Sequence, residues 1–349
     1  MPSPVLSSPI IQRPDRSQEI AAFLARVGWG RATRSHLAGD ASFRRYERVF
    51  DDERHAVLMD APPPFEDVRP FIHVTHLLGD AGLSAPSLIE TDETEGFLLL
   101  EDLGDDSFSR VLRQSPADEL QLYKTAMDAL LHLQRHVLPR DIAPYDAAVY
   151  LREIALFSDW FMPQIVGLAA AGKLRADYLN IWQELLAKGA LTQSVMVHRD
   201  YHADNLLWLP DRAGYARVGM IDYQDALYGD PFYDVVSLLE DARRDVAPDT
   251  LSAAFGHFLD GAGVDHEAAT MRYAMLGAQR NLKIIGIFTR LSVRDGKSHY
   301  LSLLPRVWAH LARDLSHPAL APLAGFLEQH VPASDRGVIA VDPTLGSLS

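Results

Sequence analysis

Hydrophobic and polar positions alternate over much of the first hundred residues, a period typical of half-buried strands. The alternation and the turns around it predict four strands, at residues 42–50, 55–59, 86–90 and 97–100. A helix is predicted to begin at Ser17, and another lies between the second and third strands. We therefore expect residues 1–103 to form a small lobe built on a mixed sheet.

After Gly104 the apolar spacing changes to three and four residues, which indicates helices. Beyond a first helix near Ser115, the pattern predicts helices at residues 147–169, 175–188, 231–245, 250–260, 267–291 and 299–313. One short β patch interrupts them, at residues 195–197, 206–209 and 218–221. The expected fold is α+β and bilobal, with a helical lobe over 104–335, a frayed tail over 336–349 and a ligand cleft near residue 103.

The amino-acid composition excludes several classes of binding partner and of metal site. Lys and Arg number 33 and Asp and Glu 47, so the net charge of −14 disfavours nucleic acid and anionic membranes. Cysteine is absent, which excludes disulfides, thiolate nucleophiles and Cys-based metal centres. No apolar run could span a bilayer and the start lacks a signal-peptide pattern, so we expect a cytoplasmic monomer that binds a small molecule. Only five basic residues are lysines, and the first is Lys124.

The densest polar cluster lies at residues 195–209, between apolar strands, and reads VMVHRDYHADNLLWL. Its spacing of His198, Asp200 and Asn205 is that of the catalytic loop of kinase-like phosphotransferases. In such a loop Asp200 accepts the proton of the substrate hydroxyl and Asn205 binds a metal ion. His198 is expected to brace the loop from its base by hydrogen bonding.

A further aspartate follows the next short apolar strand. Asp222 lies 17 residues after Asn205 and is the predicted second ligand of Mg²⁺, which prefers hard oxygen donors. The alternative is a hydrolase metal cluster made of His198, Asp200, His202 and Asp204. Because that cluster leaves Asn205 and Asp222 without a function, the sequence favours phosphoryl transfer.

Residues 195–239 resemble the aminoglycoside phosphotransferase and choline kinase superfamily, whose protein-kinase-like fold agrees with the two predicted lobes. Four further strings resemble the bacterial cell-wall sugar kinases of peptidoglycan recycling, at residues 39–49, 58–71, 96–105 and 278–291. Those kinases phosphorylate the anomeric hydroxyl of N-acetylmuramate and N-acetylglucosamine. The resemblance spans about residues 15–330 and implies an ATP- and Mg²⁺-dependent kinase with a sugar 1-phosphate product.

The resemblance also implies two nucleotide-binding segments. Residues 39–46, with Ser42, would cover the ATP phosphates, although an ordinary hairpin is the alternative. Residues 101–103 would form the hinge, where backbone groups of Glu101 and Leu103 rather than their side chains meet the adenine.

One position departs from the kinase pattern. Met59 occupies the strand position of the usual phosphate-binding lysine, and the following helix has no glutamate to pair with one. Arg44 and Arg45, on the neighbouring strand, are the candidates to replace it, because a guanidinium offers bidentate donors to phosphate. The alternative is that both are solvated strand arginines.

The helix at 278–291 is apolar over most of its circumference but carries Arg280, Lys283 and Arg290. Since buried cations require anionic partners, Arg280 or Lys283 is predicted to meet a carboxylate or phosphate of the substrate. Pairing with an acid of the chain itself is the equal alternative. Tyr201 and His202, beside the predicted base, are further candidates for contact with the sugar.

Two other functions remain open at this point. The chain could be another small-molecule kinase of the superfamily, acting on an aminoglycoside, choline or homoserine. It could also be an inactive nucleotide-binding module, as the missing lysine suggests. An acidic acceptor pocket would favour cationic substrates, whereas the basic helix at 278–291 favours neutral or anionic sugars.

Overall fold

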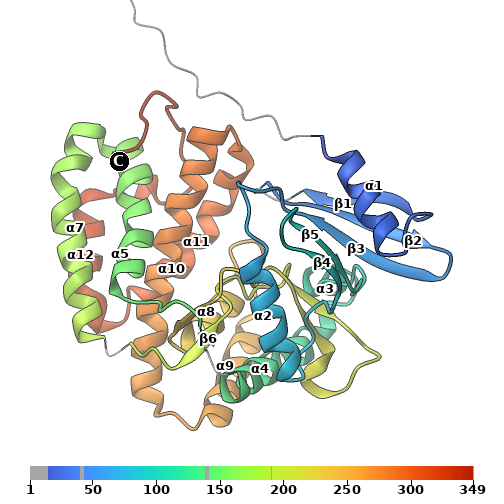
Figure 1. Ribbon diagram of the computed structural model, residues 1–349. Helices are drawn as coiled ribbons and strands as arrows, with labels where there is room; N and C mark the ends of the chain where they lie inside the picture. The colour runs from blue at the N-terminus through green and yellow to red at the C-terminus, as the bar shows by residue number, and fades with distance from the viewer. Residues whose placement is uncertain (1–14, 40–42, 138–140, 190, 349) are drawn as a thin grey trace, which may run out of the picture. The chain divides into compact units, whose positions relative to one another are not determined.

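The computed structural model describes residues 15–39, 43–137, 141–189 and 191–348, and the chain divides into two compact units (Figure 1). The first unit contains the described residues up to His76 together with Pro86–Gly104, and the second contains Leu77–Ala85 and the residues from Asp105 onward. Helices and antiparallel sheet are both present, which confirms the predicted α+β class. Within the described ranges, no helix has the length and apolar character needed to cross a membrane.

The first unit is built on a five-stranded antiparallel sheet with the order β1-β2-β3-β5-β4. Its strands are β1 (Thr33–Gly39), β2 (Arg45–Asp51), β3 (Arg54–Asp60), β4 (Leu88–Asp92) and β5 (Phe97–Leu100). β2 and β3 form the predicted hairpin, and β4 and β5 are the other two predicted strands. β1 was not predicted, because it begins with four polar residues and lacks the apolar alternation.

One face of this sheet is covered by a helix, and different side chains lie on each of the two faces. α1 (Ser17–Arg26) covers one face, where its apolar side chains pack with Val49, Ala56, Leu58, Phe97 and Leu99. Because side chains alternate along a strand, Asp60 shares this face with Leu58, and so does Arg45, which is paired with Asp60 across the hairpin. Arg16 forms a buried ion pair with Asp60 there, with 2.5 Å between Nη1 and Oδ1. Met59 and its cross-strand partner Tyr46 belong to the opposite face.

The second unit is mainly helical, and α2 (Arg69–Asp80) crosses the division between the units. Its helices are α3 (Phe108–Gln114), α4 (Glu119–His136), α5 (Ala147–Leu156), α6 (Met162–Val166), α7 (Leu168–Lys188), α8 (Phe232–Leu239), α9 (Pro248–Ala262), α10 (His266–Asp295), α11 (Leu304–Asp314) and α12 (Ala321–His330). Shorter turns are η1 (Pro116–Asp118), the π-helix η2 (Phe157–Phe161), η3 (Gly214–Arg217), η4 (Ser298–Leu303), η5 (Pro318–Leu320) and η6 (Ala333–Asp335). The predicted helix 147–169 is thus divided, because η2 interrupts it.

The predicted β patch is present but forms two separate sheets. β7 (Leu206–Trp208) pairs with β8 (Val218–Met220), as a hairpin pattern predicts. β6 (Val195–Val197) instead pairs with β9 (Leu227–Gly229), which the sequence pattern did not reveal. A three-residue strand is too short to show a period.

The C-terminal segment is not frayed, contrary to the sequence-based expectation. Gln164 of α6 donates a hydrogen bond from Nε2 to the backbone oxygen of Leu345 (3.0 Å) and accepts one from the backbone N–H of Asp342 (2.7 Å). This one side chain therefore fastens the described end of the chain to the second unit. The expectation of a frayed tail rested only on the Pro, Gly and Ser residues of positions 332–349.

α10 is the central helix of the second unit and lies between α5 and α11 in Figure 1. Its buried residues extend over most of its 30 positions, which confirms the predicted buried helix. Gly286 permits the closest approach, because a Cβ at this position would lie 2.3 Å from the carbonyl carbon of Leu156, where α5 meets η2. The spacing of α5 and α10 therefore depends on this glycine.

Gly286→Ala is expected to lower the free energy of unfolding by about 1–3 kcal/mol, because backbone atoms cannot move aside as a side-chain tip can. The measurement is denaturant unfolding of the full chain. Gly256→Ala on α9 is the matched control: its Cβ would meet nothing within 4 Å, so it should raise stability by about 0.4–1 kcal/mol. Equal effects of the two substitutions would contradict the close approach.

Candidate active site

The predicted catalytic loop begins where β6 ends, and a carboxylate from α8 holds its backbone. Asp234 accepts hydrogen bonds from the backbone N–H groups of His198 (2.7 Å) and Arg199 (2.9 Å). Arg199 has a φ of 77°, which residues other than glycine rarely adopt. Burial raises the pKa of Asp234 to about 7, although the two N–H donors act in the opposite direction. We assigned no function to Asp234 from the sequence; a lone acid near the start of an apolar helix was the available signal.

Asp200, the predicted base, is partly buried in the same loop. Burial alone would raise its pKa, but the positive charges around it, that of Lys283 first, lower the pKa below its usual value. The carboxylate is therefore ionised near neutral pH. This is the protonation state in which it can accept a proton from a hydroxyl group.

Asn205 and Asp222, the predicted metal ligands, lie side by side. Nδ2 of Asn205 is 3.0 Å from the backbone oxygen of Asp200 and 3.5 Å from Oδ2 of Asp222. The pairing of β7 with β8 brings the two residues together, and the backbone N–H of Ile221 donates a hydrogen bond to the backbone oxygen of Asn205 (3.1 Å). Gln224 donates to the other carboxylate oxygen of Asp222 (2.9 Å). One amide oxygen and one carboxylate fit Mg²⁺, which usually completes its shell with phosphate and water oxygens.

The alternative hydrolase cluster is not assembled. Among the described residues, no group of three or more His, Asp or Glu side chains is arranged to hold a metal ion. Nε2 of His202 lies 3.2 Å from Nη1 of Arg243, and Asp204 forms an ion pair with the same arginine (3.6 Å). Because the positive charge of Arg243 lies beside both His202 and Asp204, binding of a metal cation by these two side chains is disfavoured.

The aromatic and imidazole side chains of the loop are enclosed. His198 is fully buried, with its ring edge-to-face on Tyr201 and Tyr223, and burial lowers its pKa to about 4. Tyr201 is also fully buried and donates to the backbone oxygen of Ala126 (2.8 Å). This burial corrects the predicted sugar contact of Tyr201, because the side chain supports the loop from within. His202 is buried as well, and burial, then Arg243, lowers its pKa well below the usual value.

The two cations of α10 that were predicted to bind the substrate, Lys283 and Arg280, have different surroundings. Lys283 forms an ion pair with Glu153 of α5 (Nζ–Oε1, 2.9 Å) and a hydrogen bond with the hydroxyl of Tyr233 (3.3 Å). Its partner is thus an acid of the chain, as the alternative interpretation held. Arg280 is 4% exposed, and its Nη1 has no hydrogen-bond partner within the described part of the chain. Its charge contributes to the lowered pKa of Asp200.

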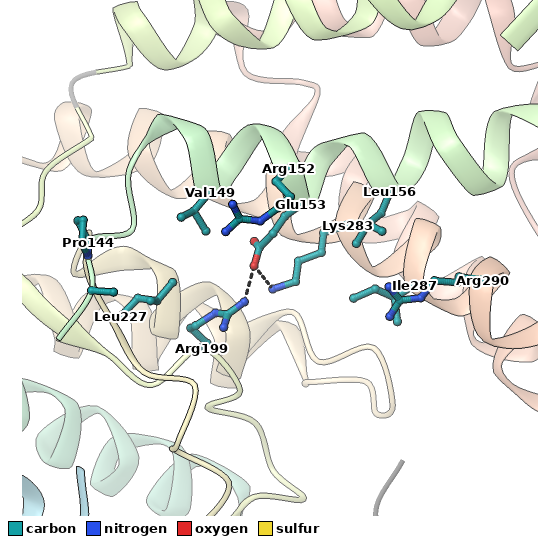
Figure 2. A pocket seen from close by; sticks show the side chains of 11 residues that line it. Pro144, Val149, Arg152, Glu153, Leu156, Arg199, Leu227, Lys283, Ile287 and Arg290 are labelled. Atoms are coloured by element: carbon teal, nitrogen blue, oxygen red, sulfur yellow. Dashed lines mark hydrogen bonds and ion pairs between the residues drawn. The ribbon is translucent and has the colours of Figure 1, made fainter. Parts of the chain in front are cut away.

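Glu153 was not predicted from the sequence, yet it is the centre of the charged groups beside the loop (Figure 2). It pairs with Arg199 as well as Lys283, and Tyr145 donates to its second oxygen. Burial by itself would raise its pKa, but Lys283 and Arg199 outweigh burial and lower the pKa to about 2. A single acid in the apolar stretch of α5 was the only sequence signal.

The predicted nucleotide-binding residues lie in the first unit. Ser42 falls outside the described residues. Arg44 forms an ion pair with Glu66 (Nε–Oε2, 3.7 Å), whereas Arg45 belongs to the face covered by α1. The side chain of Glu101 accepts hydrogen bonds from the hydroxyl (3.0 Å) and N–H (3.2 Å) of Ser87, and Leu103 is partly exposed near the end of this unit.

Two curated relatives cover most of the chain. An N-acetylmuramate/N-acetylglucosamine kinase from Caulobacter vibrioides is 36% identical, over 92% of this chain and 98% of the relative. A protein of the same name from Pseudomonas aeruginosa is 38% identical, over 86% of this chain and 90% of the relative.

The fold and the family agree with these relatives. Choline kinase LicA from Streptococcus pneumoniae matches with a TM-score of 0.61 over 88% of this chain and 99% of that structure, at 12% identity. This likeness confirms the predicted kinase-like fold. The model of the phosphotransferase enzyme family matches residues 33–271. Together with the curated relatives, this match shows that the chain belongs to the phosphotransferase enzyme family.

Proposed function

We propose that this phosphotransferase moves the γ-phosphoryl group of ATP to the anomeric hydroxyl of N-acetylmuramate and N-acetylglucosamine. The products would be ADP and a sugar 1-phosphate, formed in the cytoplasm during cell-wall recycling. The observation that carries the proposal is the arrangement of Asp200, Asn205 and Asp222. The side-chain amide of Asn205 donates to the backbone oxygen of Asp200 (3.0 Å) and lies 3.5 Å from the carboxylate of Asp222. The choice of sugar is supported by the names of the curated relatives.

In the proposed mechanism Asp200 orients the anomeric hydroxyl and accepts its proton while the oxygen attacks the γ-phosphorus in line. ADP leaves, and no covalent enzyme intermediate forms. Asn205 and Asp222 would hold Mg²⁺, which neutralises phosphate charge when bound. The hydrogen bonds that Asp234 accepts from the backbone N–H groups of His198 and Arg199 keep the loop in place. Positioning and charge neutralisation then account for most of the rate.

The charge of the second unit separates the candidate substrates. Aminoglycosides and choline are cationic, whereas the pocket beside the loop is lined by Arg152, Arg199, Lys283 and Arg290 against Glu153 alone. Such a lining favours a neutral or anionic acceptor. An inactive module is disfavoured because the carboxylate that would act as base is ionised and its neighbours are in place.

We also propose that Arg44 replaces the missing lysine. Met59 is buried, and it lies with its cross-strand partner Tyr46 on the sheet face opposite α1. Arg44 directly precedes β2, two residues before Tyr46. Glu66 orients Arg44 as a glutamate orients the lysine of other kinases. Arg45 lies on the opposite face of the sheet, under α1, where it is paired with Asp60. Its positive charge there opposes the effect of burial, which raises the pKa of Asp60.

The substrate proposal is tested by incubating the enzyme with Mg²⁺·ATP and one acceptor at a time, and following products by phosphorus NMR. N-acetylmuramate and N-acetylglucosamine should each give a sugar 1-phosphate. Kanamycin and choline should give no product above the rate of ATP hydrolysis. Faster phosphorylation of either cationic compound would contradict the proposal.

Asp200→Asn is expected to lower kcat by about 10²–10⁴-fold, because the amide cannot accept the proton. The affinity for ATP should not change, and it can be measured by calorimetry. Asp204→Asn is the matched control: this acid lies in the same loop, is 43% exposed and pairs with Arg243. It should retain kcat within about threefold, as exposed ion pairs contribute little. Unchanged turnover by Asp200→Asn would disprove its assignment as base.

Arg44→Gln is expected to raise the KM for ATP by about tenfold or more, because a charged hydrogen bond to phosphate is lost. Arg45→Gln, at the adjacent residue, should change the KM for ATP by less than about threefold. Steady-state kinetics with varied ATP distinguish the two. A larger effect at Arg45 would reverse the assignment.

A further inference from the structure

The pocket of Figure 2 has a volume of about 450 Å³, in the range of small-molecule sites, and lies between α5 and α10. It adjoins the catalytic loop, because Arg199, which lines it, directly precedes Asp200. Lys283, on its α10 side, is the charge with the largest effect on Asp200. A molecule in this pocket would therefore be close to the proposed base.

The positive charge of the pocket exceeds what its own acid can balance. Among the described residues that line it, four are cationic and one, Glu153, is a carboxylate, which Lys283 and Arg199 already share. Arg152 and Arg290 have neither an ion pair nor a hydrogen bond among the residues that the structure describes, and Figure 2 shows no dashed line to either. Two cations of the pocket thus remain available to an external anion.

Arg290 is the more enclosed of the two. Its Nε is buried and has no hydrogen-bond partner within the described ranges. Among the residues that the structure describes, Asp295 is the one acid whose charge acts on Arg290, and Arg294 engages that carboxylate through two hydrogen bonds (2.7 and 2.9 Å). Because a buried donor without a partner is unfavourable, an oxygen ligand would be bound strongly here.

Helical spacing brings the lining residues of α10 onto one face of that helix, and those of α5 onto one face of α5. Lys283, Ile287 and Arg290 are spaced as i, i+4 and i+7 and lie on one face of α10. On α5, Val149, Arg152 and Leu156 have a similar spacing. Figure 2 shows apolar side chains between the charged ones. Such a surface suits an amphipathic ligand with one anionic group.

We propose that Arg290, with Arg152 at the rim, binds the carboxylate of the acidic amino sugar and thereby favours N-acetylmuramate over neutral N-acetylglucosamine. This inference rests on the proposed function. A guanidinium can donate two parallel N–H groups to a carboxylate, so it provides both charge and orientation. Lys283 and Arg199 keep Glu153 as their partner in this arrangement.

The test compares three acceptors at saturating Mg²⁺·ATP: N-acetylmuramate, its carboxyl methyl ester and N-acetylglucosamine. Arg290→Gln should lower the ratio of kcat/KM for N-acetylmuramate to that for N-acetylglucosamine by about 10- to 100-fold, mainly through KM. The corresponding ratio for the uncharged ester should not fall. Arg290→Lys should recover part of the loss, since it retains the charge.

Arg306→Gln is the control, because this arginine lies on α11, does not line the pocket and pairs with Asp245. It should leave the ratio within about twofold. An unchanged ratio in Arg290→Gln, or an equal loss with all three acceptors in a variant of unchanged Tm, would overturn the proposal. If the unsubstituted enzyme phosphorylates neither sugar, the proposed function fails first, and the inference fails with it.

Discussion

One buried carboxylate connects the parts of the chain that the candidate site requires. Glu153 of α5 pairs with Lys283 of α10 and with Arg199 of the catalytic loop, and it accepts further hydrogen bonds from Tyr145 and Gln279. Loss of one member of a buried ion pair typically costs ~3–5 kcal/mol, since a charge is left without a partner. The positions of the two helices and of the loop are therefore coupled through this residue.

Two aspartates of the site have opposite electrostatic surroundings. Asp234 accepts two backbone N–H groups but is fully buried, so its pKa is raised. Asp200 is held ionised by Lys283 and the other cations near it. The first residue fixes the geometry of the loop and the second is available for chemistry. This separation of pKa values by environment is how one site can assign different functions to the same residue type.

Sequence spacing predicted those parts of the site that one local segment or one hairpin brings together. Asp200, Asn205 and Asp222 belong to this class, because the loop and the β7–β8 pairing place them. Glu153 and Asp234 do not, since their partners are distant in sequence and each is a single acid in an apolar helix. The fold shows the same limit: long helices and the hairpin were predicted, whereas three-residue β9 and polar β1 were not.

Met59 has a consequence for the chemical reactivity of the first unit. The lysine that a kinase normally presents to the ATP phosphates is absent, and the chain has no lysine before Lys124. Acylating reagents that modify a lysine amine near bound ATP therefore have no side-chain target in this unit. Lysine acetylation likewise cannot change the charge of its sheet, because every basic side chain there that stays charged at neutral pH is a guanidinium.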